Sequence, residues 1–185
     1  MESVLEIKTI ENAPEASNNV LTQAKNAYGF SPNLLGVMAN HPALLNSYWS
    51  SNKELAQHGV LSPTEQQVVY LTVSYENNCH YCMAAHTTLS QMSKVPQDVL
   101  DAVRNGEAIA DSKLEALRQY TKATTINRGR VSQDDIDAFN NAGYGQDHQL
   151  EVVLITGIKV LSNYINYLGQ TPLDAPFTAN AWEKK

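Results

Sequence analysis

The chain has 185 residues with 13 basic and 19 acidic side chains, and its formal net charge is −6 at neutral pH. An acidic chain without a basic stripe cannot neutralise a row of phosphates, so we expect no nucleic-acid partner. No apolar run approaches the roughly 20 residues that span a bilayer. The N-terminus also lacks the basic and then apolar segments of a signal peptide. These features predict a cytoplasmic protein with no membrane partner, folded as one domain over residues 1–185.

Apolar residues recur at helical spacing through nearly the whole chain, which predicts an all-α, single-domain helical bundle. Only residues 4–10 are expected to be extended. Glycines beyond several apolar segments are typical of helix ends. In chain order, we expect helices over residues 17–28, 33–38, 42–57, 63–75, 79–92, 96–105, 111–126, 132–141 and 146–168.

A helix boundary is expected at Asn77 and Asn78. Ser62 and Pro63 suit the N-cap and the first turn of the preceding helix, whereas Asn prefers turns and caps over helix interiors. Cys79 is therefore expected near the first turn of the next helix. Unpaired N–H groups and the helix dipole favour a thiolate at such a position.

The chain has two cysteines, Cys79 and Cys82, and both belong to the motif C-x-x-C-x-x-x-H that ends at His86. On a helix these residues stand at i, i+3 and i+7, so all three project from one face. Two thiols beside a proton carrier, with the first thiol at a helix start, favour redox chemistry. Buried core cysteines, a structural disulfide and a zinc site remain as alternatives. The zinc site lacks an evident fourth ligand, so we expect no metal and no other cofactor.

The two halves of the chain are weakly similar. A shift of 84 residues aligns Gly59 with Gly143, and Thr72 with Thr156. Under the same shift, Asn163 falls on Cys79, Asn166 on Cys82 and Gln170 on His86. This pattern is consistent with a degenerate internal duplication in which only the first copy kept the thiols, and equally with chance.

The stretch LSPTEQQVVYLTVSYENNCHYCMAAH (residues 61–86) resembles the core motif of the alkylhydroperoxidase D-like family, within the carboxymuconolactone decarboxylase-like superfamily. Two later stretches, RGRVSQDDIDAFNNAGY and LSNYINYLGQTPLD, resemble its peroxidase-related branch. The resemblance covers about residues 31–177. It implies an all-α, oligomeric fold and the reduction of peroxides by the paired cysteines.

The resemblance also implies roles for single residues. Cys82 is then the peroxidatic cysteine, the more exposed and reactive of the two, Cys79 its resolving partner, and His86 a proton relay. The family's motif glutamate falls on Gln67, and an amide cannot exchange a proton as a carboxylate does. Glu65 is a second candidate, although two positions on a helix differ by roughly 200° in direction. Glu65 is equally explained as a first-turn helix charge.

These roles predict a thiol-dependent peroxidase that reduces hydrogen peroxide or an alkyl hydroperoxide and is restored by an external dithiol or a lipoyl-type reductant. The rival interpretations are a redox-responsive or disulfide-exchange oligomer without efficient turnover, and a decarboxylase or lactone-handling enzyme. The apolar segments 63–75 and 146–168 exceed what one subunit readily covers, so we expect a homo-oligomer.

Overall fold

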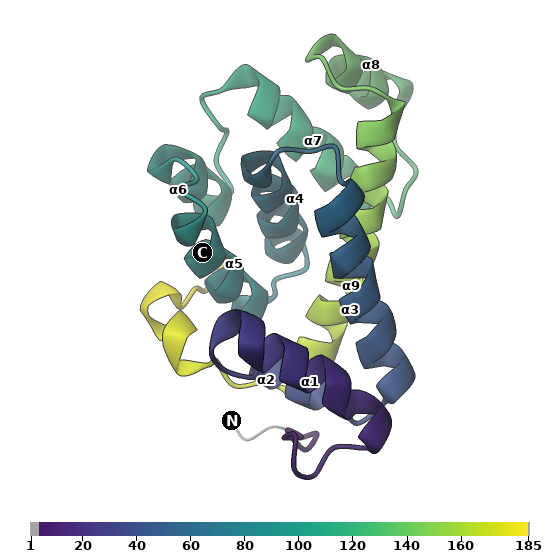
Figure 1. Ribbon diagram of the computed structural model, residues 1–185. Coiled ribbons are helices and arrows are strands. Elements are labelled where there is room, and N and C mark those ends of the chain that lie inside the picture. Colours follow the sequence, from purple (N-terminus) through teal and green to yellow (C-terminus); the bar gives the residue numbers. More distant parts are fainter. Residues whose placement is uncertain (1–3, 185) are drawn as a thin grey trace.

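The computed structural model describes residues 4–184, which form nine α-helices and one 3₁₀ helix and contain no strand (Figure 1). The predicted all-α fold is confirmed, and every expected helix is present with bounds within two residues. The 3₁₀ helix η1 near the C-terminus was not expected. The elements are α1 (Glu15–Tyr28), α2 (Asn33–Met38), α3 (Pro42–His58), α4 (Pro63–Glu76), α5 (His80–Met92), α6 (Gln97–Asn105), α7 (Ser112–Ile126), α8 (Gln133–Asn141), α9 (Gln146–Gly169) and η1 (Ala175–Asn180).

Helix α4 is the central element of the bundle, with α5, α6, α7 and α9 packed around it (Figure 1). Its residues 68–74 are all buried, as expected of a helix that is apolar on every side. Its start is fixed locally, because Ser62 and Glu65 form a capping box in which each side chain bonds the other's backbone N–H. The start of α4 is therefore defined by its own residues, and the flanking helices pack against this helix.

The junction between α4 and α5 is set by the two asparagines. Asn78 adopts a left-handed conformation (φ 52°), which Asn tolerates better than most residues. The Asn78 N–H bonds the Tyr75 carbonyl and the Cys79 N–H bonds the Ser74 carbonyl, the two hydrogen bonds of a Schellman motif. Cys79 is therefore the residue that follows one helix cap and is itself the N-cap of the next helix.

Helix α9 has an unusual distribution of polarity. Its buried face carries polar side chains beside the apolar Val152, Ile155 and Ile158, and its outer face is largely apolar. The buried polar residues are Glu151, Lys159, Ser162, Asn163 and Asn166. The exposed apolar residues are Leu150, Val153, Leu154, Leu161, Tyr164, Tyr167 and Leu168.

Contrary to the expectation from sequence, α9 is long and apolar enough to cross a membrane by length and composition alone. Of its most apolar window, 44% is buried inside the protein, and the core helix of a soluble bundle passes the same test.

We expect the outer face of α9 to cover a second copy of the chain, because large exposed apolar patches mark subunit contacts. Leu161→Glu should place a charge in that contact and reduce an oligomer to a particle near 20.4 kDa in light scattering. Ile126→Glu is the matched control, since Ile126 is similarly exposed but lies on α7. A wild-type mass near that of one chain at micromolar concentration would contradict the expectation.

Candidate active site

The two cysteines are free thiols, buried where the start of α5 meets α9. Cys79 caps α5, and its sulfur accepts the backbone N–H of Cys82 at 3.4 Å. From α9, the Asn166 side-chain amide donates to the Cys82 sulfur at 3.3 Å and lies 3.8 Å from the Cys79 sulfur. The Ser162 hydroxyl lies 3.8 Å from the Cys82 sulfur. The two thiols are thus close enough for mutual hydrogen bonding, and the Asn166 amide is a donor that stabilises a thiolate at Cys82.

The pKa values of the two thiols are shifted in opposite directions. Burial by itself would raise the pKa of Cys82, but hydrogen bonding from Cys79, the positive charge of Lys159 and the Ser162 hydroxyl outweigh it and hold this pKa well below its usual value. The hydrogen bond to Cys82 and burial raise the pKa of Cys79. Of the pair, Cys82 is therefore the thiol that ionises first as the pH rises, and Cys79 stays protonated beside it.

The expectation that Cys82 is the more exposed thiol is wrong. Its exposed fraction is 1%, against 7% for Cys79. The reason is that Cys82 lies in the first turn of α5 and faces α9, whereas Cys79 occupies the cap. Cys82 nevertheless lines the pocket described below and Cys79 does not. Access to Cys82 therefore runs through that pocket.

His86 lies between a cation and an amide. Its Nε2 is 2.9 Å from Lys159 Nζ, and its Nδ1 is 3.1 Å from Gln67 Oε1. The ring also stacks on Tyr70, with centroids 4.4 Å apart. Burial and the charge of Lys159 hold the pKa of His86 well below its usual value, so the ring is neutral near pH 7. The structure thus brings Gln67, at the family's glutamate position, into contact with the motif histidine.

Glu65 is placed away from this group. Its carboxylate completes the capping box with Ser62, accepts the Tyr144 hydroxyl at 2.9 Å and lies 3.3 Å from Lys113 Nζ. It does not line the pocket that contains Cys82. The geometry therefore favours its interpretation as a first-turn helix charge with structural partners.

Tyr81, between the two cysteines of the motif, has a structural role. Its hydroxyl donates to the Asp174 carboxylate and accepts the Leu34 N–H at 3.4 Å. Burial and the Asp174 carboxylate raise the pKa of Tyr81, so it stays protonated. These bonds fasten the segment before η1 to α2 and α5, close to the pocket.

Within residues 4–184, no three or more His, Cys, Asp or Glu side chains are grouped so as to hold a metal ion. Cys79, Cys82 and His86 share one helix, but the imidazole of His86 points to Lys159 and Gln67. A cation at Lys159 Nζ also opposes a second positive ion at this place.

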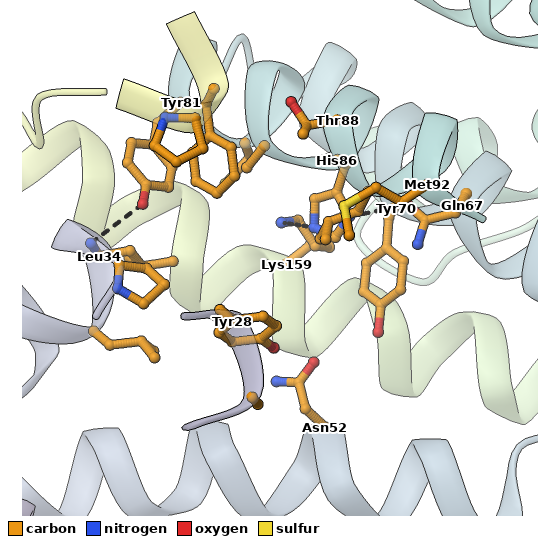
Figure 2. Close-up of a pocket in the computed structure, with 18 of the residues that line it drawn as sticks. Tyr28, Leu34, Asn52, Gln67, Tyr70, Tyr81, His86, Thr88, Met92 and Lys159 are labelled. Atoms are coloured by element: carbon orange, nitrogen blue, oxygen red, sulfur yellow. Dashed lines mark hydrogen bonds between the residues drawn. The ribbon is translucent and has the colours of Figure 1, made fainter. Parts of the chain in front are cut away.

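A pocket of about 530 Å³ leads to Cys82, His86 and Lys159 (Figure 2). In Figure 2, Lys159 and His86 lie side by side with Gln67 and Tyr70, and Tyr28 and Asn52 face them. Pockets of this size hold organic molecules rather than only a peroxide group. Its aromatic lining comes from Tyr28, Phe30, Tyr48, Trp49, Tyr70, Tyr81 and Phe177.

Three site residues on α9 were not found from the sequence, namely Lys159, Ser162 and Asn166. Lys159 was detectable in principle, since it is the only charged residue between positions 152 and 173. A lone charge in an apolar helix is commonly paired inside the protein. Asn166 was aligned with Cys82 by the weak internal repeat, but nothing in the sequence indicated that the two residues touch.

Comparison with known proteins gives a family match and several similar folds. The model of the carboxymuconolactone decarboxylase family matches residues 42–123. A search of curated proteins finds no match. A peroxidase-related protein from Ralstonia eutropha JMP134, described as an alkylhydroperoxidase AhpD core, is 19% identical with a TM-score of 0.84, and the alignment covers 96% of this chain and 95% of that one.

Two further solved structures have similar folds. A peroxidase-related protein from Silicibacter sp. TM1040 is 20% identical with a TM-score of 0.81, covering 95% of this chain and 93% of that one. A cysteine-to-alanine variant of the debrominase Bmp8, in complex with 2,3,4-tribromopyrrole, is 16% identical with a TM-score of 0.81, covering 97% and 96%. The alkylhydroperoxidase D-like fold expected from the sequence is confirmed.

We expect a thiol-alkylating reagent in limiting amount to label Cys82 before Cys79. Because the pKa of Cys82 is lowered, its alkylation rate should stay nearly constant as the pH falls through the usual thiol range, near 8.5. Peptide mapping by mass spectrometry measures this. The denatured protein is the control, in which both thiols should react alike. Preferential labelling of Cys79 would reverse the assignment.

Replacing Gln67 by Glu should raise the rate of peroxide reduction by about 10-fold, a part of the 10²–10⁴ that general acid–base catalysis supplies. A carboxylate at this position can stabilise a protonated His86 and so let the ring pass on a proton, which the neutral amide cannot do. Glu65→Gln is the matched control and should leave turnover nearly unchanged. A neutral Gln67→Glu together with an inactive Glu65→Gln would make Glu65 the proton carrier.

Proposed function

We propose that the chain, whose residues 42–123 match the carboxymuconolactone decarboxylase family and whose fold is that of alkylhydroperoxidase D-like structures, is a thiol-dependent peroxidase that uses Cys82 and Cys79. The observation that carries the proposal is that Cys82, whose pKa is held below its usual value, lines an organic-sized pocket and has the Cys79 thiol hydrogen-bonded beside it. A thiolate is the reactive form of cysteine toward an O–O bond.

The proposed cycle begins when the Cys82 thiolate attacks one oxygen of the peroxide. The O–O bond breaks, Cys82 becomes a sulfenic acid, and the remaining oxygen leaves as an alkoxide that takes up one proton. Cys79 then condenses with the sulfenic acid, forming the disulfide and releasing water. An external dithiol, of the lipoyl or a smaller type, reduces the disulfide by exchange and is itself oxidised. The net reaction turns one peroxide and one dithiol into an alcohol, water and one disulfide.

The pocket favours an organic hydroperoxide over hydrogen peroxide as the substrate. Aromatic and aliphatic side chains make up most of its lining, including Trp49, Phe177 and Leu89. Burying an apolar substituent against such a surface adds binding energy of about 25 cal/mol per Å² removed from water. Hydrogen peroxide has no such substituent.

A second candidate is thiol-dependent reductive dehalogenation of an aromatic compound. The aromatic lining of the pocket favours it, and the debrominase that shares this fold was solved with a brominated pyrrole. In that reaction a carbon–bromine bond becomes a carbon–hydrogen bond, bromide leaves, and two thiols become one disulfide. The same pair of cysteines would serve, with the same external dithiol.

The test is steady-state consumption of cumene hydroperoxide, hydrogen peroxide and 2,3,4-tribromopyrrole, with dihydrolipoamide as the reductant. We expect the highest kcat/KM for cumene hydroperoxide, loss of all turnover in Cys82→Ser, and in Cys79→Ser one oxidation per subunit without turnover. Ser93→Ala is a control outside the pocket and should behave as wild type.

Each outcome has a definite meaning. Bromide release that exceeds peroxide consumption would favour the dehalogenase. Formation of the disulfide without turnover of any substrate would favour the redox-responsive protein without efficient catalysis. Peroxide consumption that survives Cys82→Ser would contradict the proposed function.

A further inference from the structure

We propose that Lys159 is a catalytic residue of this site, whose ammonium group is the counter-ion of the Cys82 thiolate and supplies the proton that the leaving alkoxide takes. The inference rests on the proposed function and deepens it. It assigns to a lysine on α9 the proton transfer for which Gln67 is unsuited.

The first support is the position of the charge. Lys159 is 1% exposed, and an ammonium group removed from water is costly unless it is paired and hydrogen-bonded. Within residues 4–184 no carboxylate lies within ion-pair distance of its Nζ. Cys82 and Lys159 line the same pocket, and the charge of Lys159 lowers the pKa of Cys82, so the thiolate of Cys82 is the anion available to this charge in the described part of the chain.

The groups that face this charge come from three helices. Cys79, Cys82 and His86 face it from the start and the middle of α5, and Tyr70 from α4, with its ring centroid 5.7 Å from Lys159 Nζ. On α3, the hydroxyl of Tyr48 bonds Ser162 beside Cys82, and burial raises the pKa of Tyr48 and keeps it protonated. None of these neighbours competes with Cys82 as an anion at neutral pH.

The second support is the direction of the hydrogen bonds. An ammonium group can only donate, so Nε2 of His86 accepts from Lys159, and Nδ1 carries the ring proton and donates to Gln67 Oε1. Ser90 donates to the same oxygen at 3.2 Å. The amide holds the ring in this tautomer but takes no proton from it. Lys159 lines the same pocket as Cys82, so its ammonium group is a proton source for a peroxide bound there.

The steps of the cycle balance in protons and in electrons. The thiolate attacks, the O–O bond breaks, and the ammonium gives one proton to the alkoxide, which leaves Lys159 as a neutral amine. Condensation of the Cys79 thiol with the sulfenic acid releases water and needs no further proton. The external dithiol then returns both cysteines as thiols, and the Cys82 proton passes to the amine, restoring thiolate and ammonium.

The experiment compares Lys159→Met and Lys159→Arg with wild type. The control is Lys122→Met, at a half-buried lysine of α7 that does not line the pocket. Alkylation of Cys82 as a function of pH measures the thiolate and needs no turnover. Methionine should raise the pKa of Cys82 toward the usual thiol value, whereas arginine keeps the charge and should leave it low. Circular dichroism and thermal unfolding check that each variant is folded.

A second measurement separates the acid from the counter-ion. Single-turnover oxidation of the thiols is compared for tert-butyl hydroperoxide, whose alkoxide needs a proton, and peracetic acid, whose acetate does not. Lys159→Arg should slow the first by about 10²-fold, the lower end of general acid catalysis, and hardly change the second. Methylamine should restore part of the rate in Lys159→Ala.

The proposal is overturned if Lys159→Met leaves the pKa of Cys82 unchanged, or if Lys159→Arg reduces both rates equally. A wild-type protein that consumes no peroxide would refute the proposed function. In that case the pH dependence of alkylation still decides whether Lys159 is the counter-ion. The two failures therefore give different results.

Discussion

The site is organised around a positive charge held away from water. The ammonium of Lys159 emerges from an apolar helix and lies against an imidazole nitrogen and near a thiolate. Such a charge is tolerated only where its partners are held in place. The close packing of α4, α5 and α9 meets this requirement, because each of these helices contributes a neighbour to Lys159 or carries it.

This arrangement also sets the redox balance of the cysteine pair. In the reduced protein, the Cys82 thiolate and the Lys159 ammonium stabilise each other. A disulfide removes the anion and leaves the buried cation without its partner. Stabilisation of the reduced form makes a cysteine pair more oxidising. Such a pair readily accepts electrons from an external dithiol, as the proposed peroxidase cycle requires.

Local chemistry explains why so much of the fold could be predicted. The capping box at Ser62, the left-handed Asn78 and the capping aspartate and serine of later helices act within a few residues, so the sequence reveals them. The sequence also placed Gln67 at the family's glutamate position, and in the structure this residue contacts the motif histidine, His86. The site residues that could not be predicted, Lys159, Ser162 and Asn166, all lie on α9, and their positions depend on which face of this helix packs inward. Its outer face is the more apolar one, so hydrophobicity alone points Lys159 outward.

The same limit applies to exposure and to the C-terminal segment. Cys82 was expected to be exposed because it is the reactive residue of the motif. It is covered by Ser162 and Asn166, which lie 80 or more positions away in the chain. The helix η1 is short, and it is held in place by the Tyr81–Asp174 contact rather than by its own sequence pattern.

The spacing of the site residues on the two facing helices makes helix phase the most sensitive property of this protein. On one side stand Cys79, Cys82 and His86, and on the other Lys159, Ser162 and Asn166, each set at i, i+3 and i+7. Insertion of a single residue at the start of α9 would rotate Lys159, Ser162 and Asn166 together by about 100° around the helix axis. A change in chain length there, which leaves every side chain intact, would therefore separate all three contacts at once.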